Sequence, residues 1–65
     1  MNQIEAIKDA GARAATARRR GDEATARFHQ SWADKAIRLE DDPKAAREAY
    51  NKAYRDAGNP FGLGR

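Results

Sequence analysis

The chain has 65 residues, no cysteine, one histidine and a formal net charge of +3 at pH 7. The lack of cysteine excludes disulfides, thiolate metal sites and cysteine nucleophiles, and His29 has no second histidine to join in a zinc site. We therefore expect no metal and no cofactor. A chain this short buries only about 60% of the surface that its unfolded form exposes. Since its apolar residues are mostly alanine, large core side chains are few, and we expect self-association or a partner.

Three alanine-rich segments with helical spacing are separated by Gly21, by the run Asp41-Asp42-Pro43 and by Gly58. The sequence therefore predicts one all-α domain over residues 1–58, with helices at about 2–20, 22–40 and 43–57, followed by an irregular tail at 59–65. The N-terminus lacks the features of a signal peptide, and no stretch approaches the roughly 18 apolar residues of a membrane span. These features indicate a cytoplasmic protein with no membrane partner.

The apolar stripe of the first predicted helix has bulky side chains at its start and only alanine in its second half. Asn2 followed by Glu5 resembles a capping box, in which two side chains satisfy free amides at a helix start. The apolar stripe then passes from isoleucine to alanine: Ile4, Ile7, Ala10, Ala14 and Ala17. Gly11 costs on the order of 1 kcal/mol relative to alanine inside a helix. Either another helix approaches it closely, through Trp32 or from a second chain, or the glycine is merely tolerated.

The second predicted helix follows a very short link. Gly21 suits the left-handed conformation that ends a helix, and Asp22 can cap the next one. So short a link predicts an antiparallel helical hairpin. The bulky stripe of this helix is predicted to face the small residues of the first: Thr25, Phe28, Trp32, Ala36 and Leu39. His29 falls outside this stripe, toward solvent or an interface edge.

The third predicted helix begins at Asp42-Pro43, where the aspartate can cap and the proline loses no hydrogen bond. Its apolar face comprises Ala46, Ala49, Tyr50, Ala53, Tyr54 and Ala57, and Gly58 ends it. With the hairpin it makes a small three-helix bundle. We expect a core of four aromatic residues, Phe28, Trp32, Tyr50 and Tyr54. The alternative places both tyrosines on an exposed binding face, because tyrosine is enriched in interface hot spots.

The residues at the turns and helix ends resemble those of tetratricopeptide-like helical hairpins. They are Gly21-Asp22 at a turn, Ala36 and Leu39 near the end of a helix, and Pro43 at the start of the next helix. The interval from Gly21 to Pro43 is about one helical turn longer than such a repeat uses, and alanine and arginine occupy its aromatic and leucine positions. The resemblance therefore concerns hairpin punctuation alone and implies no function.

The main charge feature is the run Arg18-Arg19-Arg20, with Arg13 on the same segment, which gives residues 1–20 a net charge of +3. Such a patch could contact the phosphates of a nucleic acid. Alternatively, cations in the last turn of a helix offset the negative end of its dipole. Residues 21–40 sum to −1 and residues 41–65 to +1, so the overall field is modest, which favours the second interpretation.

No catalytic motif accompanies the available hydroxyl groups, and the glycines form no phosphate-binding loop, so we expect no enzyme. The sequence favours a protein-binding module that acts as an adaptor or inhibitor of a larger protein and forms a homo-oligomer. Its richness in alanine and arginine is typical of a high-GC bacterial or bacteriophage genome, which favours a host protein as the target. The alternative is a nucleic-acid-binding protein. The candidate partner-binding residues are Arg13, Arg18, Arg19, Arg20, Tyr50, Tyr54, Phe61 and Leu63.

Overall fold

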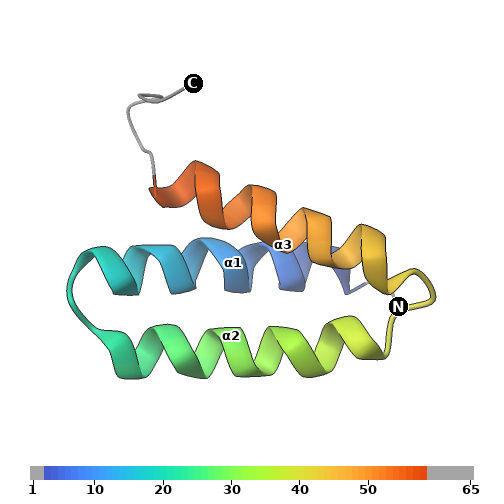
Figure 1. The fold of residues 1–65 in the computed structure, drawn as a ribbon, viewed down its shortest axis with the longest axis horizontal. Helices are drawn as coiled ribbons and strands as arrows, with labels where there is room; N and C mark the ends of the chain where they lie inside the picture. Colours follow the sequence, from blue (N-terminus) through green and yellow to red (C-terminus); the bar gives the residue numbers. More distant parts are fainter. Residues whose placement is uncertain (1–2, 59–65) are drawn as a thin grey trace.

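The computed structural model describes residues 3–58, which form three α-helices: α1 (Ile4–Arg19), α2 (Glu23–Arg38) and α3 (Pro43–Gly58). α1 and α2 make an antiparallel hairpin, and α3 returns in the direction of α1 at an angle to it (Figure 1). The all-α three-helix fold is therefore confirmed, and each helix begins and ends within two residues of its predicted bounds. Asn2 and the predicted tail, with Phe61 and Leu63, lie outside the described residues.

The central element is α1, which packs against both other helices. α2 and α3 meet each other at few residues, and an ion pair of 2.8 Å between Arg47 Nη2 and Asp34 Oδ1 links them. One side of α1 therefore receives α2 and another receives α3. This arrangement leaves much of the surface of α2 without a helix against it.

The two interhelical turns follow the predicted chemistry. Gly21 has a φ of +83°, the left-handed conformation that glycine adopts without strain. The carboxylates of Asp22 and Asp42 accept hydrogen bonds of 3.1 Å from the backbone N–H groups of Thr25 and Ala45. The capping box predicted for the first helix is wrong in register, because Gln3 occupies the N-cap position and its side chain makes no capping hydrogen bond.

The core is built mainly from alanine. Of the eleven hydrophobic residues buried among residues 3–58, eight are alanine, and Ile7 is the largest side chain that is fully buried. The central cluster comprises Ile7, Ala10, Ala33, Ala36, Ile37, Ala46 and Tyr50, with Ile4 and Tyr54 partly buried against it. Since alanine contributes little volume, the helices must approach closely to exclude water.

Gly11 marks the closest approach between α1 and α3. A Cβ atom at this position would lie 2.7 Å from the Tyr50 carbonyl oxygen and 3.4 Å from the Cβ of Ala53. Of the two interpretations of this glycine, the structure shows the close approach of another helix. The helix that approaches, however, is α3 of the same chain rather than the helix that carries Trp32.

The predicted inward face of α2 is wrong for its bulky residues, although Ala36, which it also included, is buried. Phe28, Trp32 and Leu39 are 67%, 41% and 82% exposed, so they do not fill the interface with α1. The face that packs inward is rotated by about one residue step around the helix and carries Ala26, Ala33, Ala36 and Ile37. Small residues of α2 thus meet small residues of α1. Of the four aromatic residues predicted in the core, Tyr50 is buried there and Tyr54 partly so.

Candidate protein-binding face

The largest exposed apolar side chains among residues 3–58 lie in one row that runs along α2 and onto its C-cap residue, Leu39. Phe28, Trp32 and Leu39 occupy this row at spacings of four and seven residues, which repeat on the same side of a helix. Exposed Thr25 and Lys35 fill the remaining positions of the same row. We call this row the α2 stripe: Thr25, Phe28, Trp32, Lys35 and Leu39. It carries the three largest apolar side chains that residues 3–58 leave exposed.

The α2 stripe borders a shallow hollow against α1. The hollow has a volume of about 320 Å³ and is lined by Ala6, Asp9, Ala10, Arg13, Phe28, His29 and Trp32. His29 packs edge-on against Phe28, with ring centroids 5.3 Å apart. Small alanines on α1 and aromatic rings on α2 thus form a depression into which one further apolar side chain can fit. Its rim carries the ion pair of Arg13 and Asp9, whose atoms Nε and Oδ2 lie 2.6 Å apart.

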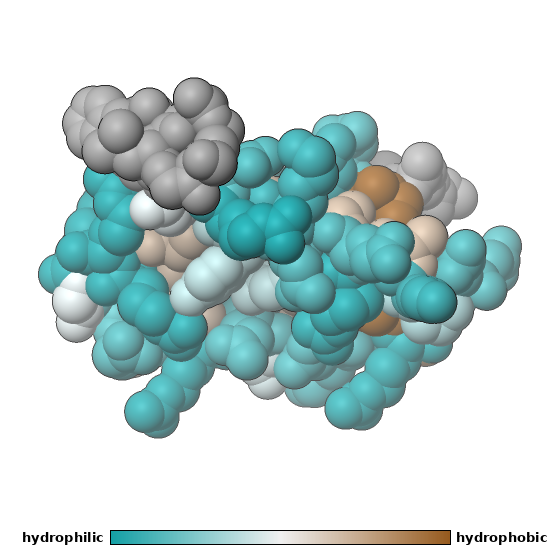
Figure 2. Space-filling view, turned by 45° about the horizontal axis from the view of Figure 1, so that its top comes forward, coloured by the Kyte–Doolittle hydropathy of each residue, from teal (hydrophilic) through white to brown (hydrophobic). Residues whose placement is uncertain are grey.

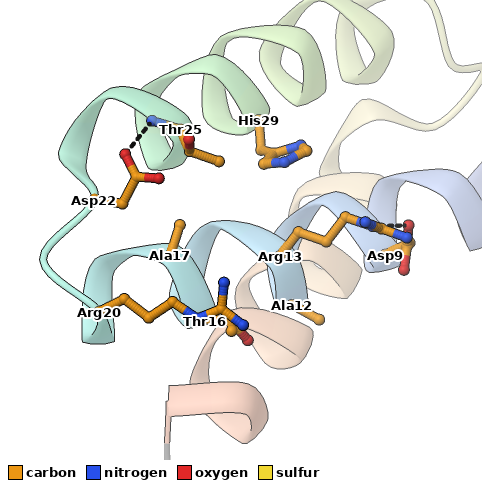
Figure 3. Close-up of a pocket in the computed structure, with 9 residues that line it drawn as sticks. All are labelled: Asp9, Ala12, Arg13, Thr16, Ala17, Arg20, Asp22, Thr25 and His29. Atoms are coloured by element: carbon orange, nitrogen blue, oxygen red, sulfur yellow. Dashed lines mark hydrogen bonds and ion pairs between the residues drawn. The ribbon is translucent and has the colours of Figure 1, made fainter.

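A second, more polar hollow lies between α1 and α2 near the hairpin turn (Figure 3). His29 points into it from α2 toward α1, while Arg20 extends along α1 (Figure 3). The formal charges of its lining balance, and both carboxylates are engaged, Asp9 by Arg13 and Asp22 by Thr25. Hydrogen bonds from the Thr25 side chain and backbone hold the pKa of Asp22 below its ordinary value. We assign no ligand to this hollow.

Two of the four arginines predicted as a binding patch contact α3. Arg18 Nη1 donates a 2.7 Å hydrogen bond to the Tyr54 hydroxyl and lies 5.9 Å from the centre of that ring. Arg19 Nη1 donates to the Ala57 carbonyl at 3.1 Å, where α3 ends. The side chain of Arg20 makes no hydrogen bond or ion pair with residues 3–58. Two of the three arginines in the run thus bridge α1 and α3.

The two predicted tyrosine sites differ in their availability. Tyr50 is 5% exposed, so the folded chain does not offer its side chain to a partner. Its hydroxyl is buried and has no hydrogen-bond partner within residues 3–58. Tyr54 is half-buried, and its ring is stacked on Tyr50 with the centroids 6.1 Å apart. The other two aromatic residues, assigned to the core from their spacing, are the exposed ones.

An apolar groove of about 640 Å³ also lies on the surface between α1 and α3, lined by alanines of both helices and by Ile4, Lys8, Lys52 and Asp56. Figure 2 shows a mainly hydrophilic face, whose strongest hydrophobic colour lies at the end where α1 begins and α2 ends.

Within residues 3–58, no group of three or more metal-ligating side chains could hold an ion. None of the described helices is long and apolar enough to cross a bilayer.

Comparison with known proteins gave no match: no protein-family model, no curated protein and no solved structure resembles the chain significantly. The functional assignment therefore depends on the geometry of the chain itself.

Proposed function

We propose that this protein is a protein-binding module whose docking face is the α2 stripe. The single observation that carries the proposal is the exposure of Phe28, Trp32 and Leu39 in one row while alanines fill the core. Burying a large apolar side chain contributes roughly 1.5–3 kcal/mol. A chain with so few large residues forgoes much of that stabilisation by leaving three of them in solvent, and binding would recover it.

The size of the surface suits a protein partner. From the exposed fractions of its three apolar side chains, the α2 stripe offers on the order of 400 Å² of apolar area. Apolar patches of this size on small proteins are often functional. A row of anchors at helical spacing is the usual way in which one helix contacts another helix or a groove. Adaptor or inhibitor of a larger protein is the role that such a face supports.

The proposed setting is the bacterial cytoplasm, with a host protein as the larger partner, as the composition favours. We also propose that the chain forms a homo-oligomer, because its alanine core is small for an independent domain. No catalytic role is included in the proposal. Nucleic-acid binding becomes less favoured, because Arg18 and Arg19 are engaged with α3.

The test is affinity capture from bacterial lysate, with and without nuclease, using the wild-type chain and a Phe28→Ser/Leu39→Ser variant. Both side chains are mostly exposed, so the variant should fold. Gln30→Ser is the matched control, since Gln30 is exposed on α2 outside the stripe. We expect a nuclease-resistant protein partner that the control retains and the stripe variant loses. Capture that is unchanged by the stripe variant, or abolished by nuclease, would contradict the proposal.

A further inference from the structure

The α2 stripe has the residue spacing of a coiled-coil contact. Its five positions alternate steps of three and four residues, as the a and d positions of a heptad repeat do, and all five are exposed. Four of the five carry apolar groups or a threonine methyl, and Lys35 is the charged exception. A single polar residue at such a position specifies the register and oligomeric state of a coiled coil at some expense of stability. Lys35 therefore restricts how a partner helix can dock on the α2 stripe.

We propose that a second copy of this chain docks on the α2 stripe, antiparallel and related by a two-fold axis. In this pairing Leu39 of each copy contacts Phe28 of the other, and Lys35 of each copy contacts Trp32 of the other. The inference rests on the proposed function to the extent that the α2 stripe is the docking face. It adds the identity of one occupant and the register in which that occupant binds.

The orientation follows from Lys35. In a parallel two-fold pair, each residue of the stripe faces its own counterpart, so the two Lys35 ammonium groups would oppose each other in the contact. In an antiparallel pair, a and d positions face one another, and Lys35 instead lies over the indole of Trp32. An ammonium group over an indole face is attracted by the ring electrons, and tryptophan is the best ring for this contact. The stripe is thus self-complementary in one orientation.

The register follows from the three apolar side chains. A pair centred between Ala33 and Asp34 matches Phe28 with Leu39 twice and Trp32 with Lys35 twice. Sliding one copy by a heptad toward either end leaves Leu39 or Phe28 opposite no stripe residue. Only the centred register therefore buries all three apolar anchors of both copies.

The hollow beside the stripe is the place where Leu39 of the second copy can insert. Its apolar lining consists of Phe28 and Trp32 from α2 and Ala6 and Ala10 from α1, with Asp9, Arg13 and His29 beside them. In the centred register, Leu39 of the second copy lies opposite Phe28, at the edge of this hollow. Leu39 is 82% exposed in the single chain, so it is available to enter without any rearrangement of the helices.

The small area of the contact places it among weak interfaces. The apolar side chains of the stripe supply on the order of 400 Å² per copy, about half of what a typical stable interface buries on each partner. We therefore expect a weak dimer with a dissociation constant in the micromolar range. The same face cannot hold a larger partner and a second copy together, so the two compete.

The first test is sedimentation equilibrium from about 0.1 µM to about 1 mM, a range that brackets a micromolar dissociation constant. The wild-type chain and the Gln30→Ser control should pass from monomer to dimer. The Phe28→Ser/Leu39→Ser variant should remain monomeric up to a concentration at least tenfold above the one at which the wild-type chain dimerises. A wild-type monomer throughout the range, or a dimer that the stripe variant leaves unchanged, would overturn the proposal.

The second test reads the register by disulfide formation, which the cysteine-free chain allows without background. In the centred antiparallel pair, position 28 lies beside position 39 of the other copy and about 16 Å from its own counterpart. An equal mixture of Phe28→Cys and Leu39→Cys chains should form mixed disulfide dimers under a redox buffer, whereas each variant alone should not. Disulfides within either single variant would show a parallel pair and overturn the proposal.

The two proposals fail in different ways. A chain that stays monomeric, yet loses its captured protein when the stripe is altered, would overturn the dimer and support the stripe as the docking face. A dimer with the predicted disulfide pairing, accompanied by capture that ignores the stripe, would support the dimer and contradict the adaptor or inhibitor role.

Discussion

Gly11 lies so close to Tyr50 that no larger residue fits between α1 and α3 without displacing one of them. A Cβ atom at position 11 would lie 2.7 Å from the Tyr50 carbonyl oxygen and 3.3 Å from its ring carbon Cδ2. The first contact is with backbone, which cannot rotate away as a flexible side chain can. This approach brings Tyr50 into the alanine core and thereby seats the one large aromatic residue that the core buries well.

Gly11→Ala should therefore destabilise the fold. Alanine gains about 1 kcal/mol of helix propensity over glycine, but the clash with the Tyr50 carbonyl forces α3 outward, and overpacking of this kind costs roughly 1–3 kcal/mol. We expect the loss to exceed the gain in urea denaturation followed by circular dichroism. Gly58→Ala is the control, because nothing lies within 4 Å of a Cβ there. A more stable Gly11→Ala protein would contradict the close approach.

Ile7→Ala should destabilise the fold more than Trp32→Ala, although tryptophan is the larger side chain. Ile7 is fully buried, so Ile7→Ala should cost roughly 2–5 kcal/mol, comparable to the whole stability of so small a domain. Trp32 is 41% exposed, so Trp32→Ala should leave the helicity and most of the stability in place. Thermal melts of the two variants at a concentration that favours the monomer compare them directly. An unfolded Trp32→Ala protein beside a stable Ile7→Ala protein would reverse our assignment of the core.

Tyr50 should make the fold sensitive to alkali. Burial raises the pKa of its hydroxyl above the ordinary 10.0, with smaller contributions from Tyr54 and Asp34. Because Tyr50 ionises more readily in the unfolded chain, the stability that it confers is intact below about pH 10 and is lost as the pH rises through its folded-state pKa. Tyr50→Phe removes both the ionisation and an unpaired buried hydroxyl. The variant should therefore be as stable as the wild type or more stable at pH 7, and its stability should change less as the pH rises above 10. A marked loss of stability at pH 7 would show that the hydroxyl makes a bond.

The arginine run should contribute to the packing of α3 more than to nucleic-acid affinity. Changing Arg18, Arg19 and Arg20 together to Ala removes the hydrogen bonds to Tyr54 and Ala57 and the ion pair with Glu23, and the loss of stability should be small because these groups are exposed. Fluorescence anisotropy with labelled duplex and single-stranded DNA and RNA at physiological salt should show weak binding by both proteins. Submicromolar binding that the triple change abolishes would place nucleic-acid recognition first.

The helices and their turns could be predicted because local chemistry determines them. Gly21, Asp22 and Asp42 act through their own backbone conformation or that of residues three positions away, which the sequence displays directly. The inward face of α2 could not be read in the same way, because two stripes compete on that helix. The bulky stripe carries Phe28 and Trp32, and the small stripe carries Ala26 and Ala33.

The choice between these stripes depends on α1, whose small residues favour close contact with α2 over bulk. Matching the alanine row of α1 to the alanine row of α2 would have given the correct face. The roles of Arg18 and Arg19 were equally hidden, since their partners Tyr54 and Ala57 lie more than thirty residues away. The candidate site was therefore missed because its residues were assigned to the core.

The most direct test of the central claim uses Trp32, the single tryptophan of the chain. If the α2 stripe lies outside the core and serves as a docking face, Trp32 fluorescence in dilute protein should be readily quenched by acrylamide. As the concentration rises, the emission should shift to shorter wavelength and the quenching should fall, with the midpoint found by sedimentation. The Phe28→Ser/Leu39→Ser variant should show no such change. Fluorescence that is shielded in dilute wild-type protein and independent of concentration would place Trp32 in the core and contradict the account.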